Sequence, residues 1–141
     1  MNTPEVLHGL AADLHHVAIA VPSIAEARAL YEGALGMTAT DVEFVPGQKV
    51  NVLVLMAGTQ RIELVEPASD DSPITGFLAK RGGGIHHLAW EVTDLADALA
   101  KLKARGIQLI HDTPQDGAHN TKVAFLHPKA CGGVLMELVQ L

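Results

Sequence analysis

An internal repeat constrains this chain more than any other feature of its sequence. A histidine pair that ends at His16 leads into an apolar, strand-like run, and the same pattern returns at His87. A glutamate between apolar residues also recurs, as Glu63 and Glu137, so the two offsets are 71 and 74 positions. Two offsets that nearly agree indicate a duplicated module.

Both copies predict the same order of elements. The first copy predicts a strand at 16–21, a helix that begins at Ser23 and ends at Gly36, and strands at 38–45, 50–56 and 60–66. The second copy predicts a strand at 87–92, a helix at 94–105 and strands at 107–111, 122–126 and 134–139. This order predicts an α+β fold of two tandem βαβββ modules.

We expect one domain over residues 14–141. It divides into module one at 14–67, a connection at 68–84 and module two at 85–141, and residues 1–13 form an N-terminal extension. Within the connection, Ser72 followed by Pro73 is a favourable start for a short helix.

Composition limits the classes of function. With 141 residues, 48% of them hydrophobic, the chain is long enough to bury a core. A net charge of −6 argues against binding to nucleic acid or to anionic lipid. No apolar run approaches the roughly 20 residues that span a bilayer. Cys131 is the only cysteine, and the amino end lacks a signal-peptide pattern, so we expect a soluble cytoplasmic protein.

The repeated side chains indicate a metal site. Imidazole nitrogens and carboxylate oxygens suit Mn, Co, Fe, Ni or Zn. The set contains no cysteine, a residue that would indicate a structural zinc site. Each module supplies one histidine and one glutamate, so a pseudo-twofold pairing of the modules would bring four ligands together: His16, Glu63, His87 and Glu137. His15 and His86 precede the histidine ligands, and strand alternation predicts that they point to the opposite face.

Longer motifs carry a family resemblance. They are Leu14–Val21, Asp71–Ile74, Gly84–Trp90, Phe125–Lys129 and Gly132–Leu138. With these motifs the chain resembles the vicinal oxygen chelate superfamily, whose paired βαβββ modules form a curved sheet around a metal site. More narrowly, it is similar to the methylmalonyl-CoA epimerases along nearly its whole length.

The resemblance implies a metal-dependent epimerase that interconverts (2R)- and (2S)-methylmalonyl-CoA by moving the C2 proton. His16, His87 and Glu137 match the family's metal ligands, and Glu63 falls at the fourth ligand position. The implied cofactor is one divalent cation, Co²⁺ or Mn²⁺ before Ni²⁺, Zn²⁺ or Mg²⁺. The implied partners are an acyl-CoA substrate and a second copy of the chain in a homodimer.

One departure from the family pattern concerns proton transfer, for which the family uses a pair of glutamates. Glu137 matches one member of this pair, but Val52 stands where some relatives carry the other. Gln48 lies nearby and is the expected cofactor-binding residue, because an amide hydrogen-bonds a carboxylate but does not act as an ordinary proton acceptor. Two candidates for the second base are therefore Glu63, released from the metal, and a metal-bound water.

Other functions fit the same scaffold. One alternative is a different metalloenzyme, such as a glyoxalase-like lyase or an Fe(II) extradiol dioxygenase. A dioxygenase needs two histidines and one carboxylate with open positions, so Glu63 argues against it. The other alternative is a small-molecule binding protein without catalysis, which needs no metal ligands.

Overall fold

The computed structural model describes residues 10–141, so most of the expected N-terminal extension lies outside the described residues. The chain forms two compact units. The first unit is His16–His86, and the second combines residues 10–15 with His87–Leu141. Strand β1 (Ala11–Ala20) begins earlier than the repeat predicts and passes from the second unit into the first.

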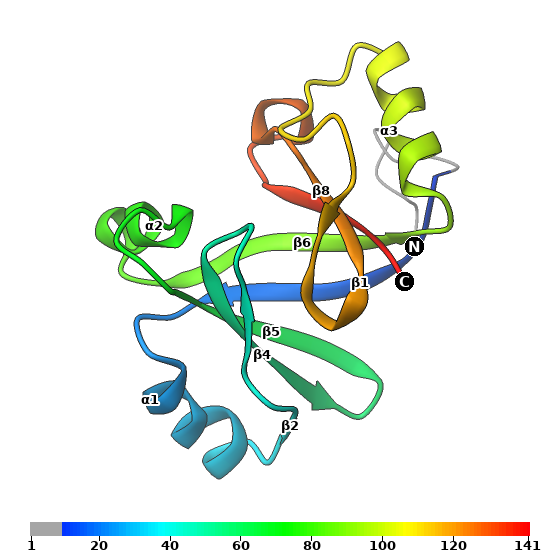
Figure 1. Ribbon diagram of the computed structural model, residues 1–141. Helices are drawn as coiled ribbons and strands as arrows, with labels where there is room; N and C mark the ends of the chain where they lie inside the picture. The colour runs from blue at the N-terminus through cyan, green and yellow to red at the C-terminus, as the bar shows by residue number, and fades with distance from the viewer. Residues whose placement is uncertain (1–9) are drawn as a thin grey trace. The chain divides into compact units, whose positions relative to one another are not determined.

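Along the chain, the first unit places helices between its first strand and the others, and a further helix after its last strand (Figure 1). Its strands pair in the order β2-β4-β5-β1, with β1 parallel to β5, and β3 also pairs with β4. The elements after β1 are α1 (Ile24–Arg28), the π-helical η2 (Ala29–Ala34), β2 (Thr38–Ala39), β3 (Glu43–Val45), β4 (Val50–Ala57), β5 (Gln60–Pro67) and α2 (Pro73–Arg81).

Helix boundaries in this unit follow the capping signals of the sequence. The Ser23 hydroxyl accepts the N–H of Glu26, and the Ser72 hydroxyl accepts the N–H of Ile74. These bonds satisfy N–H groups that have no partner within the helix. Gly36 follows η2 at φ 71°, a left-handed conformation that glycine adopts without steric cost. The predicted starts at Ser23 and Ser72 and the predicted stop at Gly36 are thus confirmed.

The two faces of the first unit's sheet have different roles. Leu53, Leu55 and Leu64 point to one face and form a buried cluster with Ile24 of α1. Because side chains alternate along a strand, their neighbours Val52, Val54 and Glu63 point to the other face. One face therefore builds the core with α1, and the opposite face carries the polar side chains described below.

The second unit repeats this plan. Its strands pair in the order β6-β9-β8-β7, and β6 is parallel to β9. The elements are β6 (Gly84–Val92), whose first three residues belong to the first unit, α3 (Leu95–Ala104), β7 (Gln115–Asp116), the 3₁₀ turns η3 (Ala118–Asn120) and η4 (Pro128–Cys131), β8 (Lys122–Leu126) and β9 (Met136–Gln140).

Helix α3 closes the core of the second unit. Asp94 caps it by accepting the N–H of Asp97, which agrees with the helix start predicted near this residue. Its apolar stripe includes Leu95, Leu99 and Leu102, and it packs on β8 and β9 through residues such as Leu138. Helical spacing of the leucines places them on one face, so this helix buries them against the sheet.

Two predicted strands differ from those observed. The strand predicted at 38–45 is divided into β2 and β3, because residues 40–42 leave the regular ladder with β4. The strand predicted at 107–111 reduces to one bridge between Leu109 and Leu126. There the N–H groups of Ile110 and His111 both donate to the carbonyl of Phe125, so the ladder is irregular. On the side of β8 that does not pair with β9, the partner strand is instead β7, in a stretch predicted as a loop.

No helix in the described part of the chain is both long and apolar enough to cross a membrane.

Candidate metal centre

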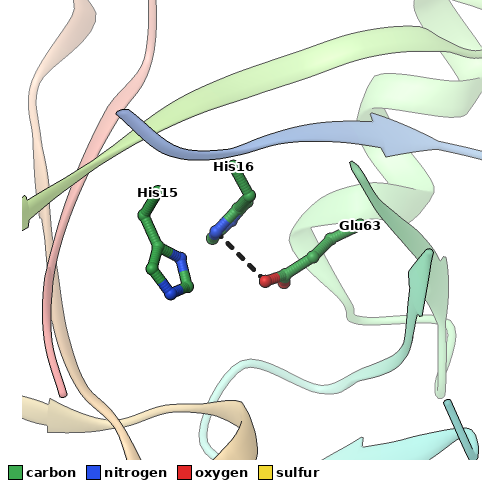
Figure 2. Close-up of side chains that lie close together, drawn as sticks. All are labelled: His15, His16 and Glu63. Atoms are coloured by element: carbon green, nitrogen blue, oxygen red, sulfur yellow. Dashed lines mark ion pairs between the residues drawn. The ribbon is translucent and has the colours of Figure 1, made fainter. Parts of the chain in front are cut away.

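The first unit holds a buried histidine–glutamate pair. Strand β1 runs parallel to β5 with Ala18 beside Glu63, and His16 lies two residues earlier on the same face. The Nδ1 atom of His16 lies 3.0 Å from Oε2 of Glu63, and Figure 2 shows the two side chains pointing toward each other. Only 4% of His16 and 8% of Glu63 is exposed, so both groups are nearly withdrawn from water.

The second unit holds an equivalent pair. Strand β6 runs parallel to β9 with Ala89 beside Glu137, and His87 again lies two residues earlier. The Nε2 atom of His87 lies 3.3 Å from Oε1 of Glu137, and both side chains are buried. The ring of Phe125 meets the imidazole of His87 edge to face, with the ring centres 5.1 Å apart.

The register is the same in both modules. In each, the alanine two residues after the histidine pairs with the glutamate of a parallel strand. The repeat found in the sequence is therefore also a repeat of strand pairing. Because this pairing fixes where each side chain emerges, both glutamates reach the imidazole of their own module.

The geometry of each pair fits a divalent metal ion. Zinc and similar ions bind imidazole nitrogen and carboxylate oxygen at about 2.0–2.2 Å, so two such ligands at a right angle lie about 3 Å apart. The separations of 3.0 Å and 3.3 Å have this size. Burying a charged carboxylate is costly unless a cation or donor compensates for it. These pairs could therefore hold a divalent metal.

His15 departs from its predicted orientation. Strand alternation predicts that it points away from His16. Instead, His15, His16 and Glu63 each offer one ligand atom, and these three atoms all lie within 4.8 Å of one another. Figure 2 shows the His15 ring beside the His16–Glu63 pair. The register with β5 begins at Val17, so pairing with β5 does not fix the orientation of the residues before it. The prediction that His15 faces the opposite side is wrong.

The remaining predicted residues lie around the β3–β4 hairpin of the first unit. Gln48 is half-buried in the turn between the strands, and its N–H donates to the carbonyl of Val45. Val52 is buried on the same sheet face as Glu63. Directly opposite Val52 on β3 lies Glu43, which the sequence did not indicate because its placement depends on strand register.

Two other histidines have local structural contacts. The Nδ1 atom of His127 accepts the N–H of Lys129 at the start of η4. The Nδ1 atom of His111 accepts the N–H of Phe125. Both contacts stabilise loops next to β8.

Comparisons with known proteins agree with this geometry. Residues 15–125 match the model of the glyoxalase/bleomycin resistance protein/dioxygenase superfamily. The mitochondrial methylmalonyl-CoA epimerase of Mus musculus is 44% identical over 128 residues, which are 90% of this chain and 72% of that protein. The crystal structure of methylmalonyl-CoA epimerase from Mycobacterium tuberculosis is similar with a TM-score of 0.88 and 37% identity, over 93% of this chain and 89% of that one.

A further solved structure is a methylmalonyl-CoA epimerase in complex with methylmalonyl-CoA and NH4+. It gives a TM-score of 0.87 and 30% identity, over 94% of this chain and 95% of that one. Similarity over nearly the whole chain, in sequence and in structure, defines the family. The chain therefore belongs to the glyoxalase/bleomycin resistance protein/dioxygenase superfamily and, within it, to the methylmalonyl-CoA epimerases.

Proposed function

We propose that the chain is a metal-dependent epimerase that interconverts (2R)- and (2S)-methylmalonyl-CoA. The observation that carries the proposal is the buried histidine–glutamate pair at the same register in both modules. Relatives of known activity support the substrate, since they are named methylmalonyl-CoA epimerase and one is solved with methylmalonyl-CoA bound.

The proposed ligands are His16, Glu63, His87 and Glu137. Their burial, their separations within each pair and the mixed nitrogen and oxygen donors support binding of a divalent cation, with Co²⁺ or Mn²⁺ as our expectation. When bound, such a cation supplies Lewis-acid stabilisation for the negative charge that develops on a thioester oxygen as the adjacent proton leaves.

The side chains have their own part in the reaction. Epimerisation removes the C2 proton from one face and returns a proton to the other, so it needs a proton acceptor and a proton donor on opposite faces. Glu137 is the proposed group for one face, because a carboxylate has two oxygens and can hold a cation and a proton at different atoms. Glu63 is the first candidate for the other face. Gln48 is the proposed donor to the substrate carboxylate.

Hydrogen exchange at C2 tests the function directly. Methylmalonyl-CoA is incubated in heavy water with the purified protein and Co²⁺ or Mn²⁺. We expect deuterium to enter C2 and the two epimers to equilibrate. A protein that binds metal but neither exchanges nor epimerises would contradict the proposal and favour a lyase or a binding protein.

The Glu63→Gln variant then tests the role of Glu63. Glutamine still offers an oxygen to a cation but does not act as an ordinary proton acceptor. Full epimerase activity in this variant would exclude Glu63 as a required base.

The expected homodimer and the expected cytoplasmic location are separate predictions. Sedimentation would test the first, and cell fractionation would test the second.

A further inference from the structure

Glu63 is proposed above both as a metal ligand and as a candidate base. If another group on the same sheet face transferred the proton, Glu63 could remain a metal ligand throughout the reaction. Glu63 lies 3.0 Å from the His16 imidazole and is 8% exposed, so leaving this position would separate a buried pair. Other carboxylates on this face of the first unit are therefore the groups to consider.

Strand pairing identifies the residues of that face. Across β5 and β4, Glu63 pairs with Val54, and Val65 pairs with Val52. On the other side of β4, Val52 pairs with Glu43 of β3. Directly opposed residues of antiparallel strands point to the same face, so Glu43 and Glu63 share it. Among the residues of β1 to β5 whose pairing within this unit is described, these two are the carboxylates of this face.

A β-bulge accounts for the orientation of Glu43. Strand β2 pairs Ala39 with Leu55, and a continuation of that register would bring Val42 opposite Val52. Instead, one extra residue lies between β2 and β3, and Glu43 takes the place opposite Val52. A single-residue shift moves every later side chain to the opposite face. The bulge thus turns a glutamate toward the face of Glu63 and a valine away from it.

The surroundings of Glu43 suit proton transfer. Val52, Val54 and Val65 are each at most 4% exposed, whereas Glu43 is half-buried, so part of this residue reaches solvent. Two strand spacings and two residues separate Glu43 from Glu63, which places their Cα atoms about 12 Å apart. Glu43 is therefore separate from the His16–Glu63 pair but lies on the same sheet face.

We propose that Glu43 is a catalytic residue of the epimerase and transfers the C2 proton on one of the two faces of the substrate. The proposal rests on the proposed epimerase function. In the forward direction one carboxylate takes the C2 proton and the other, in its protonated form, gives a proton to the opposite face. In the reverse direction their roles exchange, so no net proton is consumed.

The Glu43→Gln variant tests this role with each epimer as separate substrate in heavy water. The remaining base can still remove and return the proton on its own face. We therefore expect exchange at C2 of one epimer to persist while epimerisation falls by about 10²- to 10⁴-fold. Metal content and thermal unfolding should match the unaltered protein. The Glu43→Asp variant, which keeps a carboxylate, should recover part of the epimerisation rate.

The exposed Asp41, which lies in the bulge, offers a matched control. Asp41→Asn removes the same charge two residues away and should leave both rates unchanged. Unimpaired epimerisation in Glu43→Gln would overturn the proposal, as would parallel loss of exchange from both epimers or loss of bound metal. Absence of exchange in the unaltered protein would instead overturn the proposed function, so the two failures are distinguishable.

Discussion

Glu66 and Gln140 occupy the same place in the two modules. The Oε1 atom of Glu66 accepts the N–H of Ile24 at 2.7 Å, and Oε1 of Gln140 accepts the N–H of Leu95 at 2.7 Å. Each lies three residues after the glutamate of its buried pair, on the opposite face of the same strand. Each strand therefore presents a candidate ligand on one face and holds the start of a helix with the other.

Glu66→Ala should destabilise the protein. It removes the acceptor of the Ile24 N–H and of the Asn51 amide, which lies 3.0 Å from Oε2 of Glu66. An unsatisfied donor of this kind costs about 1–3 kcal/mol, which urea denaturation would measure. Glu66→Gln should lose less, because Gln140 performs the same task with an amide oxygen. The exposed Glu26 on α1 offers a control, and Glu26→Ala should change stability by less than about 0.5 kcal/mol.

The two histidines of the buried pairs should determine metal binding. His16→Ala and His87→Ala each remove an imidazole beside a buried carboxylate. Even residues that only support a ligand change metal affinity by about 10–100-fold, so each variant should lose at least this much. Titration calorimetry with Co²⁺ would measure the loss. His127→Ala removes a turn contact on β8 and should bind Co²⁺ normally; normal binding by the first two variants would exclude them as ligands.

The sequence was sufficient to predict the two pairs because the repeat specifies residue type and spacing together. His16 with Glu63 and His87 with Glu137 lie on parallel neighbouring strands, and duplication of the module preserves that register. The helix starts were predictable for a similar reason, since a capping residue such as Ser72 acts within a few residues of itself.

Glu43, the residue proposed above as catalytic, shows why the orientation of some side chains could not be predicted from the sequence. Simple alternation along one strand at 38–45 places Glu43 on the face opposite to Thr38. The bulge reverses this relationship, and it arises where β2 and β3 keep different registers with β4. Such a shift depends on strand pairing rather than on the residues themselves. The orientation of His15 was missed for the related reason that it precedes the part of β1 that pairs with β5.

Cys131 should be unreactive at neutral pH. Burial against the α3 core raises the pKa of the Cys131 thiol. Because the thiolate is the nucleophile, a higher pKa means a smaller reactive fraction at a given pH. Alkylation by iodoacetamide, followed by mass spectrometry, should be slower than that of a cysteine peptide at pH 8 and should accelerate as the pH rises or as urea unfolds the protein. Alkylation as fast as that of the peptide would contradict this account.

Gln48 should affect substrate binding more than the chemical step. It is half-buried in the turn before β4, on the chain segment that also carries Glu43 and Val52. A hydrogen bond to a charged group contributes about 1.5–3 kcal/mol, so Gln48→Ala should raise the KM for methylmalonyl-CoA by about tenfold or more. If the bond is equally strong in the ground state and the transition state, kcat should change little. Gln60→Ala, at the exposed turn between β4 and β5, is the control and should leave both constants unaltered. A fall in kcat without a change in KM would mean that Gln48 acts on the reaction and not on binding.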